Sequence, residues 1–241
     1  MANNVLLNNT DHRDLRVHNR YAPELGDNVM YTPTFAREFK TIQAHYPIVF
    51  QKQAQGDTFI PLALLGLENH ENLFLTDRGW DASYVPLMMQ RLPFSIGFHN
   101  DSLSRRQTRV LHIDLDHPKI SHDESGQRLF RDDGSTTEYL ERISGLLEAI
   151  HQAHADDRAF TAKLIELDLL EPVNLKIRLA DGAEGQLTGF YTVNEQKLAE
   201  LPSSPLNELH HQGWLEPIFM VIASLPKLQN LVDRKSQRLV P

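Results

Sequence analysis

Three histidines and one aspartate have the residue types that a metal site requires. His112 and Asp114 stand two positions apart at the end of a predicted strand, and His210 and His211 follow much later in the chain. Side chains two apart on a strand share a face, so the first two could bind one ion, as in two-His-one-carboxylate Fe(II) oxygenases. The alternative, which we favour, is that Asp114 binds turn amides and that His210 and His211 lie on a solvated helix.

A second candidate site combines aromatic and charged residues in one turn-like stretch. Trp80 and Tyr84 stand beside Asp77, Arg78 and Asp81. Aromatic faces stack against a ligand while nearby polar groups orient it, so this stretch suits a peptide, a sugar or another small molecule. The two aromatic residues could equally cover the core. We take this stretch as the preferred ligand-binding site.

Basic residues near the N-terminus form a third candidate. His12 and Arg16 are four apart and would share a face if this segment were helical. The guanidinium group of arginine binds a carboxylate or phosphate through two parallel hydrogen bonds. Solvation at the surface, or pairing with acids of the same chain, is the alternative.

Composition excludes several classes of function. The 241 residues include no cysteine, which rules out disulfides, thiolate metal sites and thiol nucleophiles. A net charge of −8 argues against nucleic-acid binding, which depends on clustered cations. No apolar run approaches the ~20 residues of a membrane helix, and the polar N-terminal sequence lacks a signal-peptide pattern, so we expect a cytoplasmic location without membrane insertion.

The elements expected in the N-terminal half are mostly strands. Proline and threonine near residue 33 predict a helix from Pro33 to His45, and short apolar runs predict strands over 48–51, 59–65 and 72–75. The spacing of apolar residues predicts a buried helix over 85–92, followed by strands at 94–98 and 109–115. We therefore expect this half to form a sheet with helices packed on it.

The C-terminal half has clearer patterns. Ser135 and Glu138 suggest a capping box for a helix reaching Ile150, and a second helix is expected after Asp156 or Asp157. Alternation predicts strands at 173–179 and 187–193, Asn194 caps a short helix, and Gly213 stops another. The β-branched run within 214–223 favours a buried strand, and the tail reads as a terminal helix.

These elements predict an α+β fold with a mixed, mainly antiparallel sheet packed against helices in a single compact body. We divide it into an extended N-terminal arm at 1–30, a β-rich half with the apolar core at 31–125, and an α/β half at 126–241.

Short motifs along nearly the whole chain resemble the SapC family of bacterial proteins. They include Tyr46-Pro47-Ile48-Val49-Phe50, Ala63-Leu64-Leu65-Gly66-Leu67, Tyr84-Val85-Pro86 with Arg91-x-Pro93-Phe94, Leu169-Leu170-Glu171-Pro172 and Val193-Asn194-Glu195. The resemblance implies a soluble protein of about this size. It also implies genes nearby for tryptophan-halogenase-like and cupin-like proteins and for outer-membrane nutrient receptors. It implies no particular catalytic residues.

Three functions follow as hypotheses. The sequence holds no glycine-rich phosphate loop, GxSxG elbow or HExxH motif, which favours a binding or accessory protein without cofactor. Its ligand would be a peptide, a protein partner or a small molecule. The second hypothesis is an oxygenase or hydrolase that uses Fe(II) or another divalent metal at His112, Asp114 and His210 or His211. The third is a subunit that forms a homodimer through the apolar segment 214–225.

Overall fold

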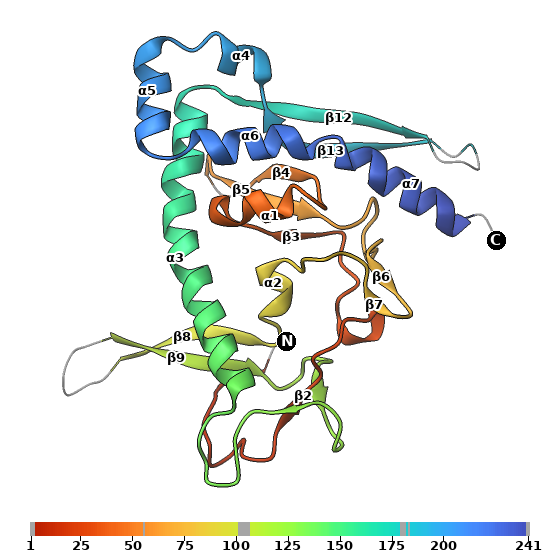
Figure 1. Cartoon of the computed structure of the whole chain (residues 1–241), viewed down its shortest axis with the longest axis vertical. Helices are drawn as coiled ribbons and strands as arrows, with labels where there is room; N and C mark the ends of the chain where they lie inside the picture. The colour runs from red at the N-terminus through yellow and green to blue at the C-terminus, as the bar shows by residue number, and fades with distance from the viewer. Residues whose placement is uncertain (1–2, 55, 101–106, 179–181, 183, 240–241) are drawn as a thin grey trace. The chain divides into compact units, whose positions relative to one another are not determined.

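A computed structural model describes residues 3–54, 56–100, 107–178, 182 and 184–239 (Figure 1). Their contacts group into two compact units that interleave along the chain. The first unit comprises Met1–Asn28, Leu75–Trp80 and Leu87–Gln152, and the second comprises Val29–Phe74, Asp81–Pro86 and Ala153–Pro241. The sequence suggested a contiguous division at residues 30 and 125, whereas these units are assembled from separated segments.

The first unit contains small antiparallel sheets. Strand β9 (Gln107–Asp114) lies between β1 (Asn4–Leu6) and β8 (Phe94–Asn100). Strand β2 (Arg16–Val17) lies between β10 (Ile120–Ser121) and β11 (Gln127–Arg128), and β6 (Leu75–Thr76) pairs with β7 (Gly79–Trp80). The short helices η1 (Pro23–Leu25) and α2 (Leu87–Gln90) also belong here. The N-terminal arm thus supplies strands to two of these sheets.

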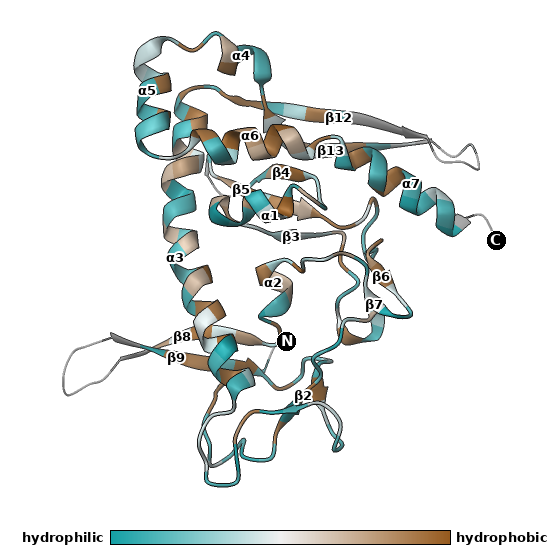
Figure 2. Cartoon of the chain, viewed as in Figure 1, coloured by the Kyte–Doolittle hydropathy of each residue, from teal (hydrophilic) through white to brown (hydrophobic). Residues whose placement is uncertain are grey.

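The core of the first unit forms between these strands and the first half of helix α3 (Glu138–Glu166). Figure 2 shows α3 with alternating teal and brown patches, as expected for a helix that buries one stripe. The buried side chains of this core come from four strands, the following loop and α3: Val17, Phe94, Ile113, Ile120, Leu129, Phe130, Tyr139, Leu140, Ile143 and Leu147.

The second unit is built on a five-stranded antiparallel sheet in the order β12-β13-β4-β5-β3. The long hairpin of β12 (Leu170–Arg178) and β13 (Glu184–Val193) joins β4 (Ile48–Lys52), which pairs with β5 (Phe59–Leu64). β3 (Tyr31–Pro33) completes the sheet at the free edge of β5. Proline in β3 fits an edge strand, because it cannot donate a ladder hydrogen bond.

Helices cover this sheet. α6 (Leu215–Ser224) packs on β4, β13 and α1 (Phe39–Ile42), and α1 continues from η2 (Ala36–Glu38). Buried Ser224 fixes the end of α6 to the sheet, because its hydroxyl oxygen accepts the Ile48 amide at 2.8 Å. The remaining helices are α4 (Glu195–Ala199), α5 (Ser203–His211) and α7 (Lys227–Leu239).

The α+β class is confirmed, with antiparallel sheets packed against helices. Asn194 caps α4 as expected, since its side-chain oxygen accepts the Lys197 amide at 2.8 Å. The predicted strand over 214–223 is wrong, because this segment is α6. Acid and proline in its first turn are typical of a helix start and outweigh the β-branched run.

Three further expectations also need correction. The two helices expected between 135 and 169 are one continuous helix, α3, which begins at Glu138 after Thr137. Of the strand predicted over 72–75, only Leu75 lies in a strand, which is β6. The strand next to β5 in the five-stranded sheet is β3. The helix expected over 33–45 is limited to 36–42, since Tyr31–Pro33 is extended.

Candidate functional site: an aromatic cleft in the second unit

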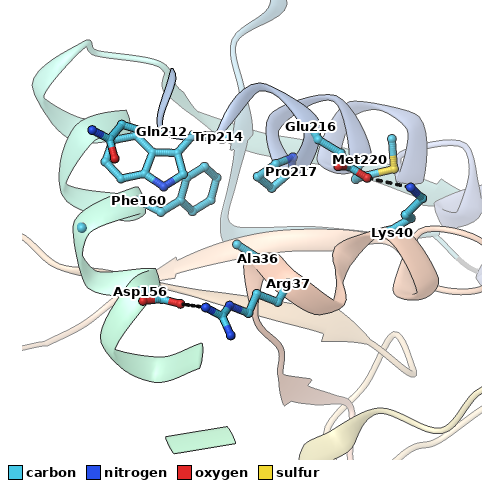
Figure 3. A pocket seen from close by; sticks show the side chains of 12 residues that line it. Ala36, Arg37, Lys40, Asp156, Phe160, Gln212, Trp214, Glu216, Pro217 and Met220 are labelled. Carbon is cyan, nitrogen blue, oxygen red and sulfur yellow. Dashed lines mark ion pairs between the residues drawn. The ribbon is translucent and has the colours of Figure 1, made fainter. Parts of the chain in front are cut away.

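A cavity of about 710 Å³ opens in the second unit between η2–α1, the C-terminal half of α3 and the start of α6 (Figure 3). Its volume lies within the range of small-molecule sites. Three segments far apart in the sequence supply its lining, and we call it the cleft: Ala36, Arg37, Lys40, Asp156, Ala159, Phe160, Gln212, Gly213, Trp214, Glu216, Pro217 and Met220.

Two aromatic rings form the apolar part of the cleft. Phe160 of α3 is buried at 1% exposure, and its ring centroid lies 6.4 Å from that of half-buried Trp214. Phe39 of α1 packs edge-on against Phe160 from the core side, at 6.2 Å. Phe160 is therefore held in place from behind, and Trp214 presents aromatic surface to the cleft.

The turn between α5 and α6 positions Trp214. Gly213 has φ +72°, the left-handed conformation that glycine adopts without strain. Its amide donates to the His210 carbonyl at 3.0 Å, and the Trp214 amide donates to the Leu209 carbonyl at 2.9 Å. This pair of bonds is a Schellman motif, which ends α5 and fixes the point where the indole enters the cleft.

Two ion pairs span the polar side of the cleft. Arg37 of η2 lies 2.7 Å from Asp156 of α3, and Lys40 of α1 lies 3.1 Å from Glu216 of α6. All four side chains are more than half exposed, so each pair contributes little to stability. A ligand that carries charge could therefore exchange with these partners at small cost.

A buried carboxylate fixes the wall that carries Arg37 and Lys40. Asp157 is 7% exposed, and its Oδ1 accepts the Ala36 amide at 2.9 Å at the start of η2. Burial raises the pKa of Asp157 to about 7, against the opposing effect of the Ala36 amide. The neighbouring carboxylates of Asp156 and Glu38 raise this pKa further, and Arg37 lowers it. The sequence predicts that a helix starts after Asp156 or Asp157, whereas Asp157 lies inside α3 and its carboxylate accepts the first amide of η2.

The chemistry available in the cleft is recognition by stacking, apolar contact and charge. None of the twelve described residues that line it is a serine, threonine, cysteine or histidine. A hydroxyl or thiol nucleophile paired with a histidine base is therefore missing from this lining, whereas aromatic surface and charges of both signs are present.

The ligand site preferred from the sequence is divided between the two units. Asp77, Arg78 and Trp80 lie on or beside the β6–β7 hairpin of the first unit. The ring of Trp80 packs edge-on against Tyr21, with centroids 5.4 Å apart. Asp77 and Arg78 are exposed and line a separate cavity of about 450 Å³.

The other two members of that set make structural contacts in the second unit. The Tyr84 hydroxyl donates to Glu38 Oε1 at 2.8 Å, and burial followed by the Glu38 charge raises the pKa of Tyr84. Asp81 Oδ2 lies 2.7 Å from Arg234 of α7, whose guanidinium also sits over the Phe74 ring at 4.5 Å. Asp81 thus ties the terminal helix to the body of its unit.

His12 and Arg16 do not share a helix face, because residues 9–14 form turns and β2 follows. His12 is buried at 9% exposure, and its Nδ1 accepts the Asn8 amide at 3.2 Å. Arg16 reaches the Gly126 carbonyl at 3.5 Å. His12 thus makes a contact within the arm, whereas Arg16 contacts the residue that precedes β11.

The candidate metal ligands fall in different units. His112 and Asp114 belong to the first unit, whereas His210 and His211 belong to the second. Asp114 Oδ1 accepts the amides of Asn3 at 2.8 Å and Asp116 at 3.2 Å, which is the turn-binding role favoured above. The His112 ring lies against Gly97, where an added Cβ would come within 2.5 Å of it. No group of three histidines, aspartates or glutamates suited to a metal ion occurs among the residues described.

Sequence reasoning missed most of the cleft. Phe160 falls within the second predicted helix and Trp214 within the predicted strand over 214–223, whereas no local motif contains Arg37, Lys40 or Glu216. A signal did exist at Gly213-Trp214, where a helix-stopping glycine precedes an aromatic residue and an acidic first turn.

The arrangement defines an α+β protein with an aromatic cleft whose lining also carries two ion pairs. The SapC family model matches residues 7–231, so the chain belongs to the SapC family. No curated protein and no solved structure matches the chain. Among the helices that the structure describes, none has the length and apolar character that a membrane crossing requires.

Proposed function

We propose that this SapC-family chain is a non-catalytic binding protein whose cleft takes a short peptide segment with one aromatic side chain beside a charged one. The observation that carries the proposal is the half-buried indole of Trp214 in a cleft whose lining also holds two exposed ion pairs. An aromatic ligand group would stack on Trp214, and its charged neighbour would exchange into the Arg37–Asp156 or the Lys40–Glu216 pair.

The partner class and the location follow as parts of this proposal. A peptide or protein partner suits an open cleft with charges of both signs, whereas a nucleic acid does not suit a net charge of −8. Action in the cytoplasm is part of the same proposal. Association with halogenase-like enzymes or nutrient-uptake proteins rests on the family resemblance.

The homodimer hypothesis has less support. The apolar residues Ile218 and Val221 of α6 are fully buried within the second unit, and Phe219 is 51% exposed. The buried apolar side chains of α6 therefore stabilise the fold of the second unit and are not available to a second copy.

Blocking the cleft tests the proposal. Ala159 lines the cleft at an exposed position of α3, so Ala159→Trp should fill it without removing core contacts. Ala149 is also exposed on α3 and lies outside the cleft, so Ala149→Trp is the matched control. The probe is an acetylated and amidated peptide with one phenylalanine between lysine and glutamate, measured by calorimetry.

We expect Ala159→Trp to weaken binding at least about tenfold, or about 1.4 kcal/mol, and Ala149→Trp to bind like the parent protein. A peptide with alanine in place of phenylalanine should bind no better to the parent than to Ala159→Trp. Equal binding of the phenylalanine peptide by all three proteins would overturn the proposal.

A further inference from the structure

A second cavity, of about 450 Å³, lies in the first unit between the 20–24 segment and the β6–β7 hairpin. Its lining combines apolar surface from Tyr21, Pro23 and Leu75 with the charged side chains of Arg20, Glu24, Asp77 and Arg78. We call it the hairpin cavity. It shares no lining residue with the cleft and so offers an independent site.

A buried ion pair holds one wall of the hairpin cavity. Lys119 Nζ lies 2.8 Å from Asp27 Oδ2, and their side chains are 2% and 0% exposed. Lys119 also donates to the Arg20 carbonyl at 2.8 Å, and Asp27 Oδ2 accepts the Ala22 amide at 3.0 Å. The pair therefore fixes the peptide groups on both sides of Tyr21.

That arrangement is costly, because each buried charge loses several kcal/mol of hydration. The attraction within the pair and its hydrogen bonds to the wall offset the loss. The Lys119 ammonium group also lies 4.6 Å from the centroid of the Tyr21 ring. The ion pair therefore holds the irregular segment around Tyr21 in one conformation before any ligand binds. Such preorganisation lowers the entropic cost of binding a ligand.

The opposite wall is a tight hairpin turn. Thr76 Oγ1 accepts the Arg78 amide at 3.2 Å and donates to the Gly79 carbonyl at 3.0 Å. Gly79 has φ +99°, which lets the turn close without strain. Trp80 packs against Tyr21 and so joins the hairpin to the first wall. The backbone that carries Asp77 and Arg78 is therefore fixed.

Charge distinguishes the two walls. Arg20 and Glu24 pair with each other at 2.8 Å. On the hairpin, neither Asp77 nor Arg78 has an ion-pair partner within the part of the chain that the structure describes. One anion and one cation thus occupy neighbouring positions on a fixed turn and line the same cavity as the apolar surface.

We propose that the hairpin cavity binds a free α-amino acid, with the ligand ammonium group on Asp77 and its carboxylate on Arg78. The apolar surface of Tyr21, Pro23 and Leu75 then contacts the ligand side chain. A zwitterion matches both charges at once, whereas a simple anion would meet Asp77 and a simple cation would meet Arg78.

The test compares L-phenylalanine with two derivatives that each lack one charge. Calorimetry on the full chain uses L-phenylalanine, N-acetyl-phenylalanine and phenylalanine amide as probes. We expect saturable binding of L-phenylalanine and at least tenfold weaker binding of both derivatives. Arg78→Gln should weaken L-phenylalanine binding at least tenfold and leave the amide unchanged, and Asp77→Asn should leave the acetyl derivative unchanged.

Two control variants distinguish binding in the hairpin cavity from binding in the cleft. Arg158→Gln, at an exposed position of α3, should bind L-phenylalanine like the parent, and so should Ala159→Trp. No saturable binding of L-phenylalanine, equal binding of the three probes, or unchanged binding in Arg78→Gln and Asp77→Asn would each overturn the proposal. Loss of L-phenylalanine binding in Ala159→Trp would also overturn it, because the amino acid would then occupy the cleft.

Discussion

Asp157 Oδ1 accepts the backbone amide of Ala36 at 2.9 Å, and this bond joins two segments 121 positions apart in the chain. It places a carboxylate of α3 at the start of η2, where the unpaired amides and the helix dipole favour negative charge. Arg37 and Lys40 follow in η2 and α1, so the bond fixes the wall of the cleft that carries them.

The first prediction concerns pH. Burial raises the pKa of Asp157 from its ordinary value of 3.8 to about 7, so the folded protein holds this proton more tightly than the unfolded chain does. The contribution of Asp157 to the free energy of unfolding is then highest at low pH and falls as pH rises from about 4 to about 7. Asp157→Asn keeps an oxygen acceptor but cannot ionise.

Urea denaturation of both proteins across this range measures the effect. The stability of Asp157→Asn relative to the parent should rise between pH 4 and pH 7, by about 4 kcal/mol at most, and stay constant above that range. Parallel pH profiles of the two proteins would show that Asp157 titrates normally.

The second prediction concerns Gly213. Gly213→Ala must adopt φ near +72° with a Cβ, so we expect a loss of about 1 kcal/mol or more in the free energy of unfolding. Gly145→Ala is the matched control, because Gly145 lies inside α3 with no other heavy atom within 4 Å of an added Cβ. That control should gain about 0.5–1 kcal/mol. Equal effects of the two substitutions would contradict the Schellman geometry.

The third prediction separates structural from ligand-binding roles at Tyr84. Tyr84→Phe removes the hydroxyl that donates to Glu38 Oε1 and should cost about 1–3 kcal/mol of stability. Binding of the phenylalanine peptide should stay unchanged at a temperature where the variant is folded. Weaker peptide binding at unchanged stability would instead assign Tyr84 to a ligand site, as the sequence suggested.

The fourth prediction concerns metal content. Because Asp114 already accepts two amides, we expect protein purified without a histidine tag to contain no stoichiometric Fe, Mn or Zn by mass spectrometry. His112→Ala should change stability alone, through the lost contact with Gly97. A stoichiometric metal that disappears in His112→Ala would favour the metal-dependent enzyme.

Local patterns explain which elements could be predicted. Alternation of Val173 and its neighbours, the cap at Asn194 and the stop at Gly213 each lie within a few residues of sequence, and all three predictions are confirmed. The β-branched residues of the run Ile218–Ile222 favour a strand, but the acid and proline at 216–217 start a helix, which is the structure that forms. Burial on one face of α6, with Phe219 exposed on the other, is set by packing on β4 and β13.

Apart from the helix stop at Gly213-Trp214, no local sequence pattern predicts the cleft. Its rings come from Phe160 and Trp214 and its charges from four further residues, and tertiary packing alone brings them together. Asp157 shows the same difficulty, since an acid that resembles a helix cap caps a segment more than a hundred residues earlier. Within the ligand site preferred from the sequence, Asp77 and Arg78 line a cavity, and their role in binding stays a prediction.

The most direct test of the binding proposal uses the fluorescence of Trp214. The chain has two tryptophans, so Trp80→Phe leaves Trp214 as the sole indole reporter. Titration with the end-blocked phenylalanine peptide should produce a saturable change in Trp214 emission, with the same midpoint as calorimetry. Peptide binding that is measured by calorimetry but leaves Trp214 emission unchanged would contradict the account, because the ligand would then lie outside the cleft.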